Sequence, residues 1–378
     1  MNAARLQQII NNYIARFEEL NAPGHTEYYK WLIIRRFRAM MDEALSAPDD
    51  AFPAKLYAVK KLTLNLIDSY TQPLNGLVEF AKKEPATVRG MFAELLRAAE
   101  ADVDVKQKAI QAFLDKSHQL RAKYFPDSYL YKDDLHSVTG YLFLYDPDHN
   151  YLYKATHCRD FADCVEFYDD WGYGDNTKLD VFFRMCDEVA AAIRTNEALL
   201  ATDASRFEID PKGMHPDREK HILLFDLIYC CSTYGLFDGI SYYVPRSGER
   251  KLIQERKNKA KELSDALQDA RGQLDQLNEA KAYLSSIFQQ GAVIRHKAYG
   301  DGEILKADGK NMTVSFPGVG EKTLGITACA VNGLVLVEDP QVQAALPGYQ
   351  DVLRREDQIR GAVSRYEREL APYAEYLG

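Results

Sequence analysis

The residue types that could do chemistry are concentrated between Tyr151 and Asp175, where the chain reads YLYKATHCRDFADCVEFYDDWGYGD. An enzyme that excises a base from DNA needs aromatic rings to stack the extruded base. It also needs a carboxylate that stabilises an oxocarbenium-like state or activates water, and some such enzymes add a lysine nucleophile. None of these steps requires a metal. The composition of this segment therefore predicts a metal-free base-excision site.

This hypothesis names three carboxylates, one amine and three stacking rings: Asp169, Asp170, Asp238, Lys154, Trp171, Tyr173 and Tyr153. A helix over RDFADCVEFYDDW would put Asp163, Glu166 and Asp170 on one face, where like charges raise the pKa of one member. The alternative interpretation is a solvated acidic face with Trp171 anchored in the core. Asp238, in GLFDGISYYVP, is a second candidate whose alternative is a plain turn.

Other kinds of enzyme fit the sequence less well. The segment FEIDPKG offers Glu208, Asp210 and Lys212 to a metal-dependent nuclease, but no convincing aspartate on an upstream strand accompanies them. The motifs of P-loop ATPases, zinc deaminases, serine hydrolases and cysteine proteases do not occur. The six cysteines contain no C-x-x-C pair, and the spacing of His157, Cys158 and Cys164 fits no zinc pattern. We therefore expect reduced thiols, no metal and no cofactor.

The first 125 residues have the pattern of a helical region. Apolar residues recur at helical spacing over 3–21, and further helices are expected over 54–70, 74–83, 85–99 and 103–123. The segment TEYYKWLIIRRFRAMMDEAL predicts a helix with a basic face, whose members are Lys30, Arg35, Arg36 and Arg38. This basic face either is simply solvated or contacts phosphate groups.

Residues 126–248 predict a mixed α/β central domain. Two β-rich runs flank the turn-forming residues Asp146 to Asn150, a pattern typical of a hairpin. The later segment HILLFDLIYCCSTYGL is apolar on every side, so its period does not distinguish a buried strand from a buried helix.

Residues 249–290 and 345–378 predict a coiled-coil arm. Apolar residues alternate at spacings of four and three along the first segment, and a matching stripe follows along the second. The simplest arrangement is an antiparallel helical pair that carries residues 291–338 at its tip. Those residues form five short expected strands, at 292–296, 302–307, 311–316, 321–325 and 334–337, separated by glycine and asparagine turns. So small an all-β unit is expected to close into a barrel.

The opening of this unit, GAVIRHKAYGDGEI, and its later strands TVSF and GEKTL resemble the SH3-like (Tudor-like) barrel at the C-terminus of UvrD/PcrA-type DNA helicases. The resemblance covers about 48 residues and rests on the spacing of its histidine, tyrosine and glycines. It implies a module that contacts RNA polymerase or nucleic acid, without the ATPase motor. The residues expected to make this contact are Arg295, His296, Lys297 and Tyr299. The alternative is a barrel that merely caps the arm.

The segments YYKWLIIRRF and GYLFLYDPDHNYLYKAT resemble short stretches of restriction and phage-defence proteins, such as McrB-like N-terminal regions. This likeness implies contact with foreign or modified DNA and assigns a role to no residue.

Composition limits the function further. The net charge of −9 and the isoelectric point near 5.5 argue against wholesale neutralisation of nucleic-acid phosphates, although a local patch can still contact DNA. No apolar run approaches the roughly 18 residues that span a bilayer, so we expect no membrane partner and a cytoplasmic location.

The whole sequence therefore predicts an α+β fold and a DNA-acting defence or repair protein. In this hypothesis a metal-free DNA glycosylase excises an ordinary or modified base from double-stranded DNA. The alternatives are a non-enzymatic adaptor that binds RNA polymerase or another protein through the barrel, and a purely structural coiled-coil assembly factor.

Overall fold

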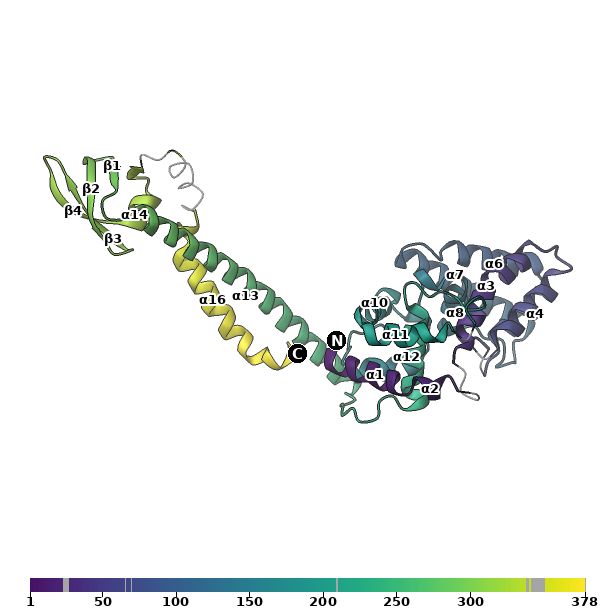
Figure 1. Cartoon of the computed structure of the whole chain (residues 1–378). Helices are drawn as coiled ribbons and strands as arrows, with labels where there is room; N and C mark the ends of the chain where they lie inside the picture. The colour runs from purple at the N-terminus through teal and green to yellow at the C-terminus, as the bar shows by residue number, and fades with distance from the viewer. Residues whose placement is uncertain are drawn as a thin grey trace. The chain divides into compact units, whose positions relative to one another are not determined.

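The structure is a computed structural model, and it describes residues 1–22, 27–64, 66–68, 70–208, 210–337, 340 and 351–377. The chain divides into two compact units, Met1–Lys251 and Leu252–Gly378 (Figure 1). In the described residues the first unit is helical, and the second combines helices with a small antiparallel sheet. The expected α+β class is therefore confirmed.

Helices and short 3-10 turns build the described part of the first unit (Figure 1). In chain order they are α1 (Ala3–Ala15), α2 (Phe17–Leu20), α3 (Tyr29–Ser46), α4 (Phe52–Thr63), α5 (Pro73–Ala81), α6 (Pro85–Arg97), α7 (Val103–Tyr124), α8 (Leu135–Tyr145), η1 (Pro147–His149), α9 (Ala155–Cys164), η2 (Gly174–Asn176), α10 (Leu179–Thr195), α11 (Glu197–Arg206) and α12 (His221–Tyr234). The four helices expected between residues 54 and 123 are confirmed as α4 to α7, although α4 ends early, at Thr63.

The expected hairpin around residues 146–150 is wrong. Its first arm is helix α8, which Asp134 caps by accepting a hydrogen bond from the Ser137 backbone N–H at 3.0 Å while the Ser137 hydroxyl bonds back to the Asp134 N–H. Such a capping box satisfies two backbone donors at a helix start. Because α8 is buried on nearly all sides, its hydrophobic pattern carried no helical period. The local capping chemistry, rather than the pattern, identifies it as a helix.

The ambiguous apolar segment of the central region is also a helix. It forms α12, which ends at Gly235, where φ is 73°. A glycine in this left-handed conformation is a common helix terminator. No strand occurs among the described residues of 126–248, so the expected mixed α/β domain is replaced by helices and loops.

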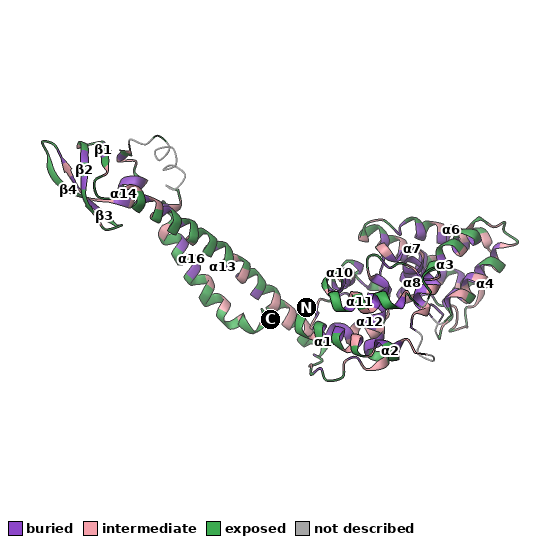
Figure 2. Cartoon of the chain, viewed as in Figure 1, coloured by how far each residue is buried: buried purple, intermediate pink, exposed green. Residues whose placement is uncertain are grey.

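The first unit has one hydrophobic core. It extends without a break from Leu6 in α1 to Ile240 after α12 and includes buried residues of nearly every helix between them. Figure 2 shows these buried positions along the inner sides of the helices. The helical region 1–125 and the central region 126–248 therefore fold around a shared core rather than as two domains.

The second unit begins with a helical pair. Helix α13 (Ser247–Ile287) crosses the unit boundary, and α16 (Glu356–Leu370) packs beside it through Leu267, Ala270 and Val363. Ion pairs join Lys281 to Glu356 at 2.6 Å and Arg271 to Glu367 at 2.9 Å. Since later residues of α13 meet earlier residues of α16, the pair is antiparallel, as the two stripes predicted. A 3-10 turn, η3 (Ala371–Tyr376), follows α16.

The five expected strands are confirmed as β1 (Val293–His296), β2 (Gly300–Ala307), β3 (Asn311–Phe316), β4 (Gly320–Gly325) and β5 (Val335–Val337). They form one antiparallel sheet in the order β4-β3-β2-β1-β5, with a register shift in β2 between Ile304 and Lys306. A Cβ at Gly302 would come within 2.5 Å of the Phe316 ring, so close packing of this strand requires glycine.

The sheet is open in the described residues, because β4 and β5 lie at opposite edges and do not pair. Its buried face packs on α14 (Ile326–Val331) and on the end of α13, through residues such as Ile326, Leu284 and Phe288. Helices thus cover the apolar face that barrel closure was expected to bury. The strands of the expected barrel are present, but the closed barrel is not seen.

A search of the described helices finds none with the length and apolar character that crossing a bilayer demands.

Candidate functional site

The acidic and aromatic segment does not form the single helix expected from the sequence. Helix α9 ends before Glu166, which has a φ of 56° and breaks the helical path. Asp163 forms a two-pronged ion pair with Arg250, with N–O distances of 2.5 and 3.0 Å. Glu166 pairs with an arginine of α1 at 2.9 Å. The prediction that Asp163, Glu166 and Asp170 share one helix face is therefore wrong.

The three carboxylates expected to be catalytic make contacts of a structural kind. Asp169 forms an ion pair with Arg184. The exposed Asp170 accepts a hydrogen bond from the Gly172 backbone N–H at 3.0 Å, which closes a local turn. Asp238 is exposed in the turn after α12, where its own backbone N–H donates to a carbonyl at 3.1 Å.

The three rings expected to stack a base differ in accessibility. Trp171 is completely buried, Tyr153 is 3% exposed, and both pack edge-on against Phe182. Tyr173 is 66% exposed, and the guanidinium carbon of Arg159 lies 4.5 Å from its ring centre. Stacking a base on Trp171 or Tyr153 would require unpacking the core, so Tyr173 is the one of the three that can receive a base.

The nuclease candidates are surface residues. Glu208, Asp210 and Lys212 are exposed, and Asp210 accepts a hydrogen bond from the Gly213 backbone N–H at 2.9 Å. Within the described ranges, no group of three or more histidine, cysteine, aspartate or glutamate side chains has an arrangement that could hold a metal ion.

Lys154 has a different environment from the other predicted site residues. It precedes helix α9 and is half-buried, with its Nζ atom 4.6 Å from the centre of the Tyr229 ring. No carboxylate among the described residues forms an ion pair with it. Burial lowers the pKa of Lys154, and the positive charge of Lys30 lowers it further. A lysine with these properties is suited to nucleophilic catalysis, because its amine sheds a proton more readily.

His157 lies one turn into α9 and stacks on the same tyrosine. The imidazole of His157 and the Tyr229 ring are 5.0 Å apart and nearly parallel, with an interplanar angle of 7°. Nε2 lies 3.2 Å from the hydroxyl of Thr233, whereas Nδ1 is buried and has no hydrogen-bond partner in the described structure. Burial, together with the charges of Lys154 and Lys30, lowers the pKa of His157 to about 4. This imidazole is therefore neutral at pH 7, and its low pKa makes it a weak base that can relay a proton but does not retain it.

A second lysine contacts the same ring. The Nζ atom of Lys30 is 4.2 Å from the Tyr229 ring centre, so the two ammonium groups lie within about 9 Å of each other, close enough to influence each other's charge. Lys30 is 1% exposed and forms ion pairs with Asp226 at 2.5 Å and Glu27 at 2.6 Å. Burial opposes the charge of Lys30, but these carboxylates outweigh it and raise the pKa.

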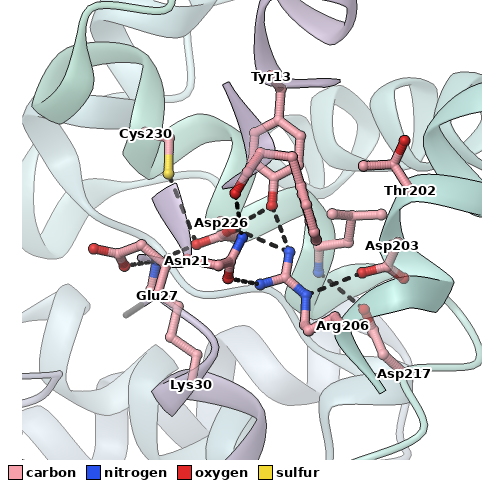
Figure 3. Close-up of polar contacts among 12 residues, drawn as sticks. Tyr13, Asn21, Glu27, Lys30, Thr202, Asp203, Arg206, Asp217, Asp226 and Cys230 are labelled. Atoms are coloured by element: carbon pink, nitrogen blue, oxygen red, sulfur yellow. Dashed lines mark hydrogen bonds and ion pairs between the residues drawn. The ribbon is translucent and has the colours of Figure 1, made fainter. Parts of the chain in front are cut away.

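A buried polar network holds Lys30 in place (Figure 3). Tyr13 of α1 donates to Asp226 of α12 at 2.5 Å and accepts from Arg206 of α11 at 2.6 Å. Arg206 also bonds to Asp203 at 3.3 Å and lies 3.9 Å from the Trp31 ring. Four helices, α1, α3, α11 and α12, thus meet at charges that are completely buried. Because each charge has a partner of opposite sign, the attraction between partners offsets the free-energy cost of removing the charges from water.

Sequence reasoning assigned Lys30 to a basic surface together with Arg35, Arg36 and Arg38, and this is wrong for Lys30. The three arginines are exposed, as expected, whereas Lys30 is buried. A signal was available, because Lys30 lies at helical spacing from Ile33, Ile34, Phe37 and Met41, which form the buried stripe of α3. Tyr229 gave no comparable signal, since it lies in a segment that is apolar on all sides.

The residues expected to bind at the C-terminal unit separate into two groups. His296 is 6% exposed and stacks on Tyr299 at 4.6 Å, and both rings pack against Phe316, so this histidine and tyrosine contribute to the core of the sheet. Arg295 and Lys297 are exposed. Arg295 forms a two-pronged ion pair with Asp301, with N–O distances of 2.5 and 3.0 Å. Of these four residues, the two cations are the most accessible to a partner, since Tyr299 is partly buried.

Comparison with known proteins gives no relative: no family profile, no curated protein and no solved structure matches this chain.

Proposed function

We propose that this chain is a metal-free enzyme acting on DNA, in which the amine of Lys154 attacks the sugar carbon that carries the base. One observation carries the proposal: a half-buried lysine with a lowered pKa, and with no carboxylate ion-pair partner among the described residues, shares the Tyr229 ring with a neutral histidine. The combination places an amine nucleophile and an imidazole that can relay its proton against the same ring.

The reaction step balances with these two groups. The Lys154 amine forms a bond to C1′ of the nucleoside, and the bond from C1′ to the base breaks, so the base leaves with the bonding electrons. The proton that the attacking amine loses passes through His157 to the departing base. Opening of the sugar gives an imine between Lys154 and C1′, and water later hydrolyses it to free the enzyme.

The roles expected for Asp169, Asp170 and Asp238 do not enter this proposal. Their surface ion pair and turn contacts give no support for catalysis. Tyr173 remains the ring to stack an extruded base, because it is exposed and already holds Arg159 against it.

Reduction of the imine tests the proposal directly. The purified chain is mixed with duplexes that carry an ordinary, a deaminated, a methylated or an abasic site, and sodium borohydride is added in EDTA. We expect a covalent protein–DNA adduct on denaturing gels, mapped by mass spectrometry to Lys154 and lost in Lys154→Ala. The exposed Lys178→Ala is the matched control and keeps the adduct. No adduct on any duplex, or an adduct that persists in Lys154→Ala, contradicts the proposal.

A second candidate function, an adaptor that binds RNA polymerase or another protein, is favoured by the solvent side of the sheet. Val293, Leu305 and Leu336 are 48%, 38% and 42% exposed there, and Leu336 pairs across strands with Arg295. Exposed apolar groups beside charges are typical of protein-binding surfaces. If the chain is this adaptor, RNA polymerase core enzyme binds it in surface plasmon resonance, and Val293→Glu with Leu336→Glu abolishes binding while Lys154→Ala does not. Equal binding by both variants argues against it.

A further inference from the structure

A hollow of about 790 Å³ lies between α4, α5 and the start of α6. This volume is within the range of small-ligand sites, about 300 to 1,000 Å³. None of its lining residues belongs to the Lys154, His157 and Tyr229 site or to the buried network. It is therefore a separate feature of the first unit, independent of the function proposed above.

The wall of the hollow combines apolar and acidic groups. Val78 and Ala81 of α5 are buried and face it, and three carboxylates, Asp49, Asp50 and Glu79, lie around it with one cation, Lys82. Lys82 pairs with Glu79 at 2.6 Å, whereas Asp50 is exposed and has no hydrogen bond or ion pair in the described structure. Asp49 also has a partner, Arg89, so Asp50 is the carboxylate of this wall that has none among the described residues. Its charge favours a cationic ligand and repels an anionic one such as DNA.

Two aromatic residues of α4, the buried Phe52 and the wall residue Tyr57, already attract cations of the chain itself. The guanidinium carbon of Arg89 lies 4.9 Å from the Phe52 ring, and its Nη1 atom lies 2.6 Å from Asp49. Lys61 Nζ lies 4.7 Å from the ring of Tyr57, which is still 42% exposed. Asp49 of the wall and the neighbouring Phe52 ring thus already hold an arginine of the chain. Asp50 and Tyr57 offer the same two chemical groups without an arginine of the chain.

We infer that the hollow binds a peptide segment of a partner protein, and that an arginine of this segment lies between Tyr57 and Asp50. A guanidinium can form two parallel hydrogen bonds to a carboxylate in its own plane while its flat face stacks on a ring, and a lysine ammonium has no such flat face. The methylene groups of the arginine and a neighbouring apolar side chain contact Val78 and Ala81.

Fluorescence anisotropy with defined peptides tests this inference on the full-length chain. The probe is a fluorescein-labelled, end-blocked heptapeptide of alanine, leucine and glycine with one central arginine, and its partner has citrulline in place of arginine. We expect the arginine peptide to bind and the citrulline peptide to bind about tenfold more weakly, because citrulline keeps N–H donors but lacks the positive charge. Lys61→Ala should strengthen binding, since Lys61 competes for the Tyr57 ring.

Variants of exposed residues distinguish this site from others on the chain. Asp50→Asn and Tyr57→Ala should each weaken binding of the arginine peptide about tenfold, while the exposed Glu18→Gln and Tyr70→Ala leave it unchanged. All four positions are at the surface, and circular dichroism verifies that the variants fold. Equal binding of both peptides, no binding to the unmodified chain, or unchanged binding in Asp50→Asn and Tyr57→Ala overturns the inference. These variants should leave borohydride trapping at Lys154 unchanged, so the two proposals are tested separately.

Discussion

Lys30 and Lys154 contact the same tyrosine ring, yet their surroundings give them opposite properties. Lys30 is completely buried and keeps its charge, because Asp226 and Glu27 raise its pKa. Lys154 is only half-buried, but its pKa is lowered by burial and by Lys30. The comparison shows that burial alone does not neutralise a lysine. The carboxylates within reach decide whether a buried amine stays a structural cation or becomes a nucleophile.

The largest expected effect, on the free energy of unfolding, comes from removing a carboxylate that compensates the charge of Lys30. Asp226→Ala would leave Lys30 and Arg206 buried with fewer opposite charges, and removal of one partner of a buried pair typically costs about 3 to 5 kcal/mol. Urea unfolding followed by circular dichroism measures this loss. Asp170→Asn, at an exposed turn, is the control. A loss in Asp226→Ala no greater than in the control would mean that the network does not stabilise the fold.

A second prediction concerns pH and the buried carboxylate of Asp217 beside the network. Both of its oxygens accept backbone N–H groups at the start of α12, at 3.0 and 2.9 Å, but burial raises its pKa to about 7. Since the folded state binds this proton more tightly than the unfolded state, the contribution of Asp217 to stability is full below pH 4 and is lost as pH rises toward 7.

The variant Asp217→Asn isolates this contribution. The difference in unfolding free energy between the unmodified chain and the variant, measured in urea, should shift by about 4 kcal/mol in favour of the variant from pH 4 to pH 8. Asp115→Asn, at an exposed position, should show no such shift. A difference that is constant across this range would show that Asp217 does not titrate in it.

A third prediction sharpens the contrast between the two lysines. In pulse acetylation with acetic anhydride across a pH series, Lys154 should become reactive at lower pH than the exposed Lys178, and Lys30 should stay unreactive while the protein is folded. In Lys30→Met, the pKa of Lys154 should rise, because a nearby like charge is removed. Peptide mass spectrometry reads all three sites. Identical profiles for Lys154 and Lys178 would remove the basis of the proposed chemistry.

The smallest expected effects on stability and on trapping come from the carboxylates that the sequence predicts to be catalytic. Asp170→Asn and Asp238→Asn each change an exposed turn residue, so the unfolding free energy should change by less than about 0.5 kcal/mol. Borohydride trapping at Lys154 should also be unchanged. Loss of trapping in a folded Asp170→Asn protein would restore this residue as a catalytic candidate and count against the assignment to Lys154 and His157 alone.

Much of the architecture could be predicted from the sequence, because short-range hydrophobic periodicity and turn residues specify it. The antiparallel pair of α13 and α16 follows from two apolar stripes, and the five strands follow from glycine and asparagine turns between short β-rich runs. The predictions were wrong where tertiary packing, rather than the local sequence pattern, determined the structure. Helix α8 is buried on nearly all sides, so its pattern predicts a strand, and α14 and α13 cover the apolar face of the sheet that barrel closure was expected to bury.

The candidate site was predictable only in part. The sequence by itself identified Lys154 as a chemical group within an aromatic and acidic segment. It could not show that Tyr229 would lie against Lys154 or that Lys30 would pair with Asp226, since Lys30 and Asp226 are 196 positions apart. The tertiary structure alone decided which lysine is compensated, because the pKa of a buried amine depends on distances to charges that the linear sequence does not fix.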